Sequence, residues 1–286
     1  MLATLIWSGN FIVARGYSTA IPPVTLAVLR WVFAAVLVTP FGLAYVRRDW
    51  PVIRAHSRYY LLVSLLGVTG FNTLIYIAGH TTQAVNLSLI STAGSPIFII
   101  LLSRIFFREH IPARRAIGIG VVLCGVLLLI SKGEISTFSK LQFASGDLWM
   151  LSATLLFATY SLLMLHRPGQ THQLSVLTVT FWAGLILGLL PLWGLEIYFG
   201  AEIRPGWDWI PLGLYLGGGA SLAAFFCWNK AMDYIGAAKA GIIYFTLPAF
   251  CGLEAVLFLG EPLLPVHFIS AGLIVLGILF ATRARG

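Results

Sequence analysis

Charged side chains are scarce in this chain. Aspartate, glutamate, lysine and arginine make up 10% of its 286 residues, whereas 59% of the residues are hydrophobic. The mean hydropathy is +0.92. A soluble domain carries about 25% charged residues, and a water-covered surface cannot be built from so few. The composition therefore excludes an ordinary soluble protein and indicates a chain embedded in lipid.

Cysteine is also rare, and several functional signatures are missing. The three cysteines, Cys124, Cys227 and Cys251, lie inside apolar stretches and predict neither a disulfide nor a metal cluster. The sequence has no phosphate-binding loop, no zinc-ligand spacing and no nucleophile elbow. We expect no cofactor, no metal, no ATP hydrolysis within this chain and no enzymatic activity. No basic leader with a cleavage site precedes the first apolar run, which predicts a retained helix.

The apolar residues fall into ten runs, each close to the length of about 20 residues that a membrane-spanning helix requires. The runs are continuously apolar and do not alternate with a period of two, which favours helices over a barrel. Only the connections 46–58, 131–145 and 199–209 are long enough to count as extended loops. The predicted spans are 2–20, 24–45, 59–79, 84–106, 114–131, 146–165, 174–198, 210–232, 238–259 and 265–282.

The net charge of +8 is unevenly distributed along the chain. Thirteen lysines and arginines lie in alternate connections and at the C-terminus, whereas the other connections hold Lys132, Lys140 and Arg204. Such a bias places the arginine-rich connections and both termini in the cytoplasm, as in a multi-pass protein of the bacterial inner membrane. The basic charge is then a signal of topology with some contact to anionic lipid, and it does not indicate nucleic acid binding.

The second half of the chain repeats the first. Pro96 is followed by Glu109 after thirteen positions, and Pro248 is followed by Glu261 after the same interval. A shift of 152 positions aligns residues 76–127 with 228–279 without a gap. Chance similarity between apolar helices explains single matches but not a shared register of proline, glutamate and glycine. The pattern therefore indicates an internal duplication.

The duplication divides the chain into residues 1–131 and 146–286. Each half contains five predicted spans, and because five is odd the second half must enter the membrane from the opposite side. We therefore predict an all-α integral membrane protein of ten transmembrane helices, arranged as two inverted five-helix repeats. This organisation is typical of secondary transporters.

Several motifs resemble the EamA-type drug/metabolite transporter superfamily over essentially the whole chain. They are Trp7-Ser8-Gly9-Asn10-Phe11 with Arg15, Gly146-Asp147-Leu148, and the paired Pro-x12-Glu elements with their glycine-rich helices. The full pattern is most similar to bacterial aromatic amino acid exporters of the YddG type. The resemblance implies a ten-helix carrier with a central cavity that exports small metabolites by alternating access. Predicted spans 1, 3, 4, 6 and 9 carry almost no cations, which argues against phosphorylated substrates.

Polar and aromatic side chains inside the spans are the candidates for substrate contact. Polar groups in lipid point toward a cavity or another helix, and residues four apart share a helix face. The repeat map sets polar residues of the first half opposite apolar or aromatic residues of the second, which suits an amphipathic metabolite. The alternative interpretation is ordinary helix packing. The predicted contact residues are Trp7, Asn10, Asn72, Tyr76, His80, Ser91, Ser95, Phe157, Tyr160, Trp228 and Tyr244.

Two prolines and two titratable residues suggest dynamic roles. Pro96 and Pro248 lie near the middle of their spans and are candidate hinges, with a static kink as the alternative. His80 and Glu254 are candidates for proton coupling, although His80 also fits a solvated position at the outer end of its span. We expect Arg30 to lie near the outer surface with its side chain extended to the interface.

Further residues fit structural roles. Glu109 and Glu261 are expected to cap helices or pair with loops. The small-residue pairs Gly184–Gly188 and Gly213–Gly217 predict closely packed helices.

Together these features predict an exporter of small metabolites, most simply of aromatic or hydrophobic amino acids. Purines and small amino acids such as threonine are the alternative substrates. An oligomeric solute channel is the alternative from another class, and a membrane scaffold without a solute is a third. The expected partners are an amino acid-like solute and membrane lipid. The oligomeric state stays open, with a monomer as one plausible form.

Overall fold

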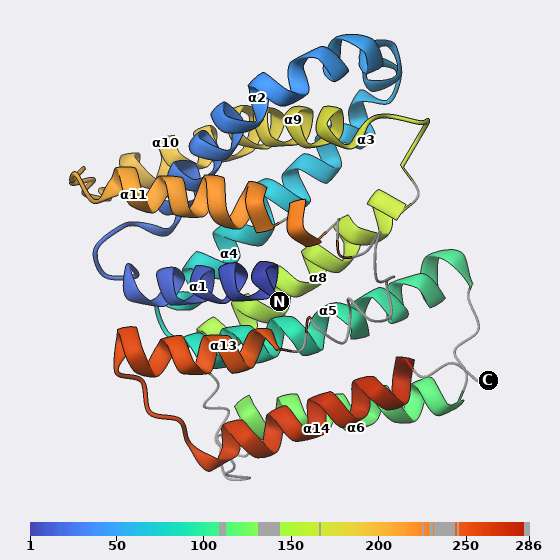
Figure 1. The fold of residues 1–286 in the computed structure, drawn as a ribbon, viewed down its shortest axis with the longest axis vertical. Coiled ribbons are helices and arrows are strands. Elements are labelled where there is room, and N and C mark those ends of the chain that lie inside the picture. The colour runs from blue at the N-terminus through green and yellow to red at the C-terminus, as the bar shows by residue number, and fades with distance from the viewer. Residues whose placement is uncertain are drawn as a thin grey trace.

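The computed structural model describes residues 1–108, 113–130, 144–165, 167–224, 226–228, 231, 244 and 246–282, and the regular structure within these residues is helical (Figure 1). Residues 109–112, 131–143 and most of 229–245 lie outside this description, so Glu109 and the predicted turn between the eighth and ninth spans fall there.

The first half of the chain forms α1 to α6, and a π-helical stretch connects α3 to α4. The bounds are α1 Leu2–Gly16, α2 Pro23–Ala55, α3 Ser57–Ser64, the π-helical stretch Leu65–Gly70, α4 Phe71–Gly79, α5 Ala84–Phe107 and α6 Ala113–Ile130.

The second half forms α8 to α14 and contains three further π-helical stretches. The bounds are α8 Ser145–Leu165, α9 Gln173–Ala183, a π-helical stretch Gly184–Leu189, α10 Leu190–Tyr198, α11 Trp209–Gly213, a π-helical stretch Leu214–Ala223, α13 Leu247–Glu254, a π-helical stretch Ala255–Leu259 and α14 Pro265–Thr282.

Helix is present in each of the ten predicted apolar runs. Within the described residues, six continuous helices are long and apolar enough to cross a membrane, so the chain is a multi-pass membrane protein. They are Pro23–Ala55, Ser57–Gly79, Ala84–Phe106, Ser145–Met164, Gln173–Tyr198 and Trp209–Trp228.

The predicted extended loop 46–58 is wrong, because α2 continues to Ala55 and α3 begins at Ser57. The cluster of arginines marks the end of an apolar span but does not end the helix, since charged residues extend a helix into water. The added turns are also packed: Ile53 is buried against Tyr60 and Val176.

The small-residue pairs lie where helices approach closely, as the sequence predicts. A Cβ at Gly184 would lie 2.5 Å from the Cβ of Val68. A Cβ at Gly217 would lie 2.6 Å from the backbone nitrogen of Ala34 and 2.9 Å from the carbonyl oxygen of Arg30. The contact at Gly217 brings the continuous helix Trp209–Trp228, called the eighth segment from here on, directly against α2.

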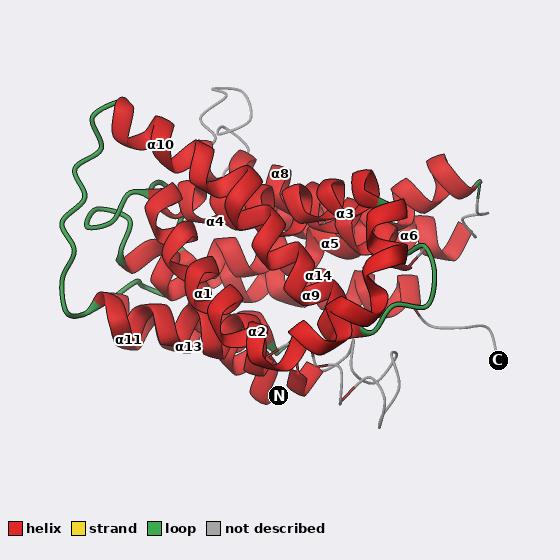
Figure 2. Cartoon of the chain, turned by 90° about the horizontal axis from the view of Figure 1, so that it is seen from above, coloured by secondary structure: helices red, strands yellow, loops and turns green. Residues whose placement is uncertain are grey.

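In Figure 1 the helices are stacked one above another along the longest axis of the molecule, with α2 and α9 near the top and the closely packed pair α6 and α14 at the bottom. The connections α1–α2, α4–α5, α10–α11 and α13–α14 gather at one end of the bundle. Helix α1 lies between these layers and contacts both α4 and α13 (Figures 1 and 2). Residues of the two halves therefore meet around α1.

Candidate solute-binding site

Arg30 lies at the centre of a buried polar cluster that joins four helical segments. Its Nε donates to Ser221 Oγ at 2.9 Å, and its Nη1 donates to Asn10 Oδ1 at 2.7 Å and to Tyr76 OH at 3.4 Å. The Tyr76 hydroxyl also donates to Asn10 Oδ1 at 3.1 Å. Side chains from α1, α2, α4 and the eighth segment are thereby fixed to one guanidinium group.

This position contradicts the expectation that Arg30 extends to the membrane interface, because only 5% of its surface is exposed. The long α2 packs along the eighth segment at Gly217, which directs the side chain toward Ser221 and away from lipid. Sequence reasoning did not identify Arg30 or Ser221 as site residues. The available signal was an arginine well inside an apolar span, where a charge is costly and commonly functional.

Three of the predicted aromatic contacts form a second cluster beside the first. The ring centroids of Trp7 and Trp228 are 5.6 Å apart, those of Trp7 and Tyr244 are 6.1 Å apart, and those of Trp228 and Tyr244 are 5.6 Å apart. All three pairs are tilted or edge-on, which is the favoured geometry for aromatic rings. Ser91 forms a hydrogen bond with Tyr244 and ties this cluster to α5.

The aromatic and polar clusters meet at two consecutive residues of the eighth segment. Trp7 Nε1 donates to the carbonyl oxygen of Ala220 at 2.9 Å, and Ser221 accepts the bond from Arg30. On α1, Trp7 and Asn10 are three residues apart and lie on one face. An aromatic surface and a cationic polar surface are therefore about one helical turn apart.

The remaining predicted aromatic residues lie apart from these clusters. Phe157 packs against Phe71 with centroids 4.8 Å apart, and Tyr160 lies 6.1 Å from Phe157. Tyr160 also covers Gly67, where a Cβ would meet its ring at 2.7 Å. The side chain of Asn72 also lies near Gly67, because its Nδ2 donates to the Gly67 carbonyl at 3.1 Å. The contacts of Phe157 and Tyr160 with neighbouring helices fit packing.

The serines of α5 divide between local bonds and contacts with other helices. Ser95 donates to the carbonyl of Ser91 at 2.9 Å, one turn earlier in the same helix. Ser88 donates to the carbonyl of Val85 at 2.7 Å. Ser91 is thus the predicted serine that reaches the aromatic cluster, whereas the hydroxyl of Ser95 is already bonded.

Glu254 contacts α1 at Ser8, two residues before the Asn10 that bonds to Arg30. Its Oε1 accepts a hydrogen bond from Ser8 at 2.9 Å, and its Oε2 has no partner among the described residues. Tyr215 stands nearby and donates to the carbonyl of Ile6 at 2.7 Å. A carboxyl group with one unpartnered buried oxygen is a suitable proton acceptor, and Glu254 remains a candidate for proton coupling.

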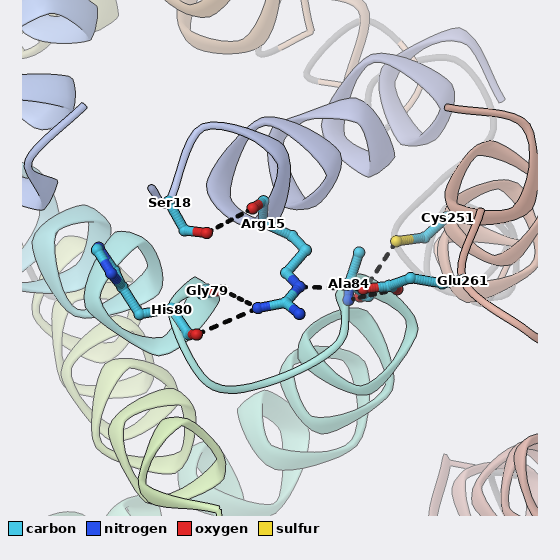
Figure 3. A network of polar contacts seen from close by, with 7 residues as sticks. All are labelled: Arg15, Ser18, Gly79, His80, Ala84, Cys251 and Glu261. Atoms are coloured by element: carbon cyan, nitrogen blue, oxygen red, sulfur yellow. Dashed lines mark hydrogen bonds and ion pairs between the residues drawn. The ribbon is translucent and has the colours of Figure 1, made fainter. Parts of the chain in front are cut away.

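A second polar network lies at the end of the bundle where α1, α4 and the π-helical stretch Ala255–Leu259 finish (Figure 3). Arg15 donates from Nε to Glu261 Oε1 at 3.2 Å and from Nη1 to the carbonyls of Gly79 and His80 at 3.2 and 3.1 Å. Glu261 Oε2 accepts from the backbone nitrogen of Ala84 at 3.0 Å. The prediction that Glu261 caps a helix or pairs with a loop is confirmed for the cap, at the start of α5.

His80 belongs to this network through its backbone and not its ring. Figure 3 shows the imidazole directed away from Arg15, and the residue is exposed. The protein covers part of the ring, and this partial desolvation lowers the pKa of His80, with a smaller contribution from the charge of Arg15. A ring that is neutral at pH 7 and turned outward makes His80 the weaker candidate for proton coupling.

The two predicted hinge prolines stand in different settings. Pro96 lies inside α5. Pro248 occupies the first turn of α13, which begins at Leu247 in the described part of the chain. A proline in the first turn of a helix lacks no intrahelical hydrogen bond, and the role of Pro248 as a hinge stays a prediction. The role of Pro96 as a hinge stays a prediction.

The sequence matches the model of the EamA-like transporter family over residues 1–131 and again over residues 144–283. The chain belongs to the EamA-like transporter family. Members of this family are transporters and not enzymes, so the protein moves small molecules across a membrane.

Individual relatives of this EamA protein are distant. It is 26% identical to the uncharacterized transporter YyaM of Bacillus subtilis over 80% of this chain and 74% of that protein. It is 24% identical to an S-adenosylmethionine/S-adenosylhomocysteine transporter of Chlamydia muridarum, over 96% and 88% of the two chains. It is 22% identical to a probable terminal-alkyne amino-acid exporter of Streptantibioticus cattleyicolor, over 99% and 92%.

A solved crystal structure shares the fold of this EamA protein. The TM-score is 0.65 at 22% sequence identity, and the match covers 98% of this chain and 94% of the other. The arrangement of helices described above is therefore one that an experimentally determined chain also adopts.

Proposed function

We propose that this protein exports aromatic or other hydrophobic amino acids across the bacterial inner membrane by alternating access. The single observation that carries the proposal is the meeting of the two clusters at Ala220 and Ser221. Trp7, Trp228 and Tyr244 offer ring surfaces, and Asn10 and Tyr76 lie about one turn away in the polar cluster. An aromatic amino acid has the same two parts, an apolar ring and a polar head.

The proposed architecture is ten transmembrane helices in two inverted repeats, with residues 1–131 and 146–286 as the halves and both termini in the cytoplasm. The occurrence of helix in every predicted run supports it. In this arrangement the clusters lie between the halves, because α1, α2 and α4 come from the first and Ala220, Trp228 and Tyr244 from the second. Secondary transporters bind their solutes at such a seam.

The printed functions of the relatives support an organic solute. One is named as a probable amino-acid exporter and another as a transporter of S-adenosylmethionine and S-adenosylhomocysteine. The aromatic character of the Trp7 cluster favours a solute with a ring.

Counterflow in proteoliposomes tests the proposal. Vesicles loaded with unlabelled tryptophan should accumulate external labelled tryptophan transiently, since a carrier returns loaded more readily than empty. Threonine and purines at the same concentration should compete weakly. Equilibration without trans-stimulation would indicate a channel, and stimulation by phosphate esters alone would overturn the substrate class.

A matched pair of variants connects transport to the site. Trp7→Ala removes one ring of the aromatic cluster, and we expect the KM for tryptophan to rise about tenfold, on the order of 1.4 kcal/mol. Trp207→Ala is the control, because 90% of Trp207 is exposed. Equal kinetics in the two variants would place the solute elsewhere.

A further inference from the structure

Arg30 is a buried cation whose contacts are all neutral. Its three hydrogen-bond partners are an amide, a phenol and a hydroxyl, and none carries a formal negative charge. The ion pairs found in the described residues join other groups, namely Arg15 with Glu261, Arg48 with Asp49, and Arg204 with Glu202. Within that part of the chain, the charge of Arg30 has no counter-ion.

An uncompensated charge within a membrane protein is costly, and arginine stays protonated at every physiological pH. The ring of Trp31, 5.3 Å from the guanidinium carbon, offsets part of this cost through a cation–π contact. That contact is available equally with or without a solute. The positive charge of Arg30 is therefore surrounded by neutral partners, and an anionic group could still pair with it.

The hydrogen bonds also leave one side of the guanidinium uncommitted. Nε and Nη1 are occupied by Ser221, Asn10 and Tyr76, whereas Nη2 donates to none of the described residues. The bonded nitrogens fix the plane of the group, so the donors of Nη2 are held in a fixed direction. A guanidinium held in this way is suited to a planar anion such as a carboxylate.

We propose that Arg30 is the counter-ion for the carboxylate of the transported solute, so that this carrier accepts carboxylates and rejects the corresponding amides and amines. The proposal rests on the proposed function and assigns the head-group contact within the same site. The ring of the solute then lies against Trp7, which shares a face of α1 with Asn10. A single cation matches the single charge of a carboxylate better than the ~1.5–2 charges of a phosphate ester.

The experiment compares tryptophan with analogues that differ in one group. Tryptophanamide and tryptamine lack the carboxylate, and indole-3-propionate keeps it but lacks the amine. Each competes with labelled tryptophan in counterflow by the wild-type protein. We expect tryptophan and indole-3-propionate to compete at least tenfold better than the amide and the amine.

Variants then assign the effect to Arg30. Arg30→Gln should lose this preference by bringing the four competitors within about threefold of one another. Arg47→Gln is the matched control, because it makes the same change on the same helix at an exposed position. Size-exclusion profiles and melting curves in detergent establish whether each variant is folded.

Each outcome decides a different proposal. If wild-type protein carries tryptophan and accepts the amide equally well, the assignment of Arg30 is overturned while the export function stands. This comparison needs no variant, so misfolding of Arg30→Gln does not rescue the assignment. A different result is that the protein carries no aromatic solute but carries another carboxylate and rejects the amide of that solute. The proposal of an aromatic substrate is then wrong, whereas the role of Arg30 stands. If wild-type protein binds no carboxylate in a melting-curve panel, both proposals fall.

Discussion

Asp49 and Glu196 each cap the start of a neighbouring helix, at opposite ends of the pair formed by α2 and the continuous helix α9–α10. Asp49, near the end of α2, accepts a hydrogen bond from the backbone nitrogen of His172 at the start of α9, at 2.7 Å. Glu196, near the end of α10, accepts from the backbone nitrogens of Val24 and Thr25 at the start of α2, both at 2.8 Å. Each antiparallel partner thus supplies the acceptor for the free N–H groups of the other.

Removal of one of these caps should destabilise the bundle measurably. Glu196→Ala leaves two backbone N–H groups and the Thr25 hydroxyl without their acceptor, so we expect the free energy of unfolding to fall by about 1–3 kcal/mol. Glu202→Ala is the control, because its ion pair with Arg204 is exposed and should contribute less than about 1 kcal/mol. The measurement is the denaturation midpoint in detergent, and equal midpoints would contradict the capping role.

Two glycine substitutions should differ in their effect on stability. Gly217→Ala places a Cβ 2.6 Å from the backbone nitrogen of Ala34, which forces the eighth segment away from α2 and costs about 1–3 kcal/mol. A Cβ at Gly272 in α14 meets no described atom within 4 Å, so Gly272→Ala should be neutral or stabilising by up to about 1 kcal/mol. Thermal unfolding of both variants tests the pair. A stable Gly217→Ala protein would show that the close packing at Arg30 is dispensable.

The contribution of Glu261 to stability should decrease as the pH rises. Its pKa is raised above 4.5 by burial, against the opposing effects of the Ala84 hydrogen bond and of Arg15. The unfolded chain therefore releases this proton at a lower pH than the folded protein. The stabilising contribution is complete below the unfolded pKa and is lost as the pH passes the raised folded pKa.

Glu261→Gln cannot titrate and provides the reference for this effect. The stability of the wild-type protein relative to Glu261→Gln should be greatest below the ordinary carboxyl pKa and decline as the pH rises through the raised pKa of the folded protein. Unfolding midpoints of the two proteins across this range provide the measurement. A difference that grows with pH would mean that the ion pair with Arg15 outweighs burial.

Proton coupling, if export uses it, should depend on Glu254 and not on His80. Glu254→Gln removes the titratable group beside Ser8, and we expect transport to lose its response to an imposed pH gradient. His80→Ala should keep that response, because the lowered pKa keeps the exposed ring neutral above about pH 6.5. Tryptophan flux with and without a pH gradient separates the variants. A response lost only in His80→Ala would reverse the assignment.

The sequence predicted where the helices lie better than it predicted how their faces meet. Hydropathy located every helical run, since a long apolar segment in lipid must satisfy its backbone within a helix. Hydropathy gave no information on helix ends outside the bilayer, and for that reason 46–58 was predicted as a loop. The aromatic cluster was predictable as a set of residues, but its geometry depends on contacts between α1 and segments more than 200 positions away.

Arg30 shows most clearly what a single sequence leaves undetermined. The sequence shows how far Arg30 lies from the start of its span. The orientation of its side chain, however, depends on Gly217 and on Ser221, which lies 191 residues further along the chain. The periodicity of one helix does not identify its partner helix. A charge placed seven residues into a span is therefore equally compatible with extension to the interface and with burial among neutral partners.

The bonding of Arg30 also has a consequence for biogenesis. Synthesis proceeds from the N-terminus, so only Asn10 of its three partners exists when α2 leaves the ribosome, and Ser221 follows 191 residues later. The guanidinium group must therefore enter the bilayer with the Asn10 side chain as its one available hydrogen-bond partner. Helices α1 and α2 are therefore expected to insert together as a hairpin, and a nascent chain lacking Asn10 should leave α2 outside the membrane more often.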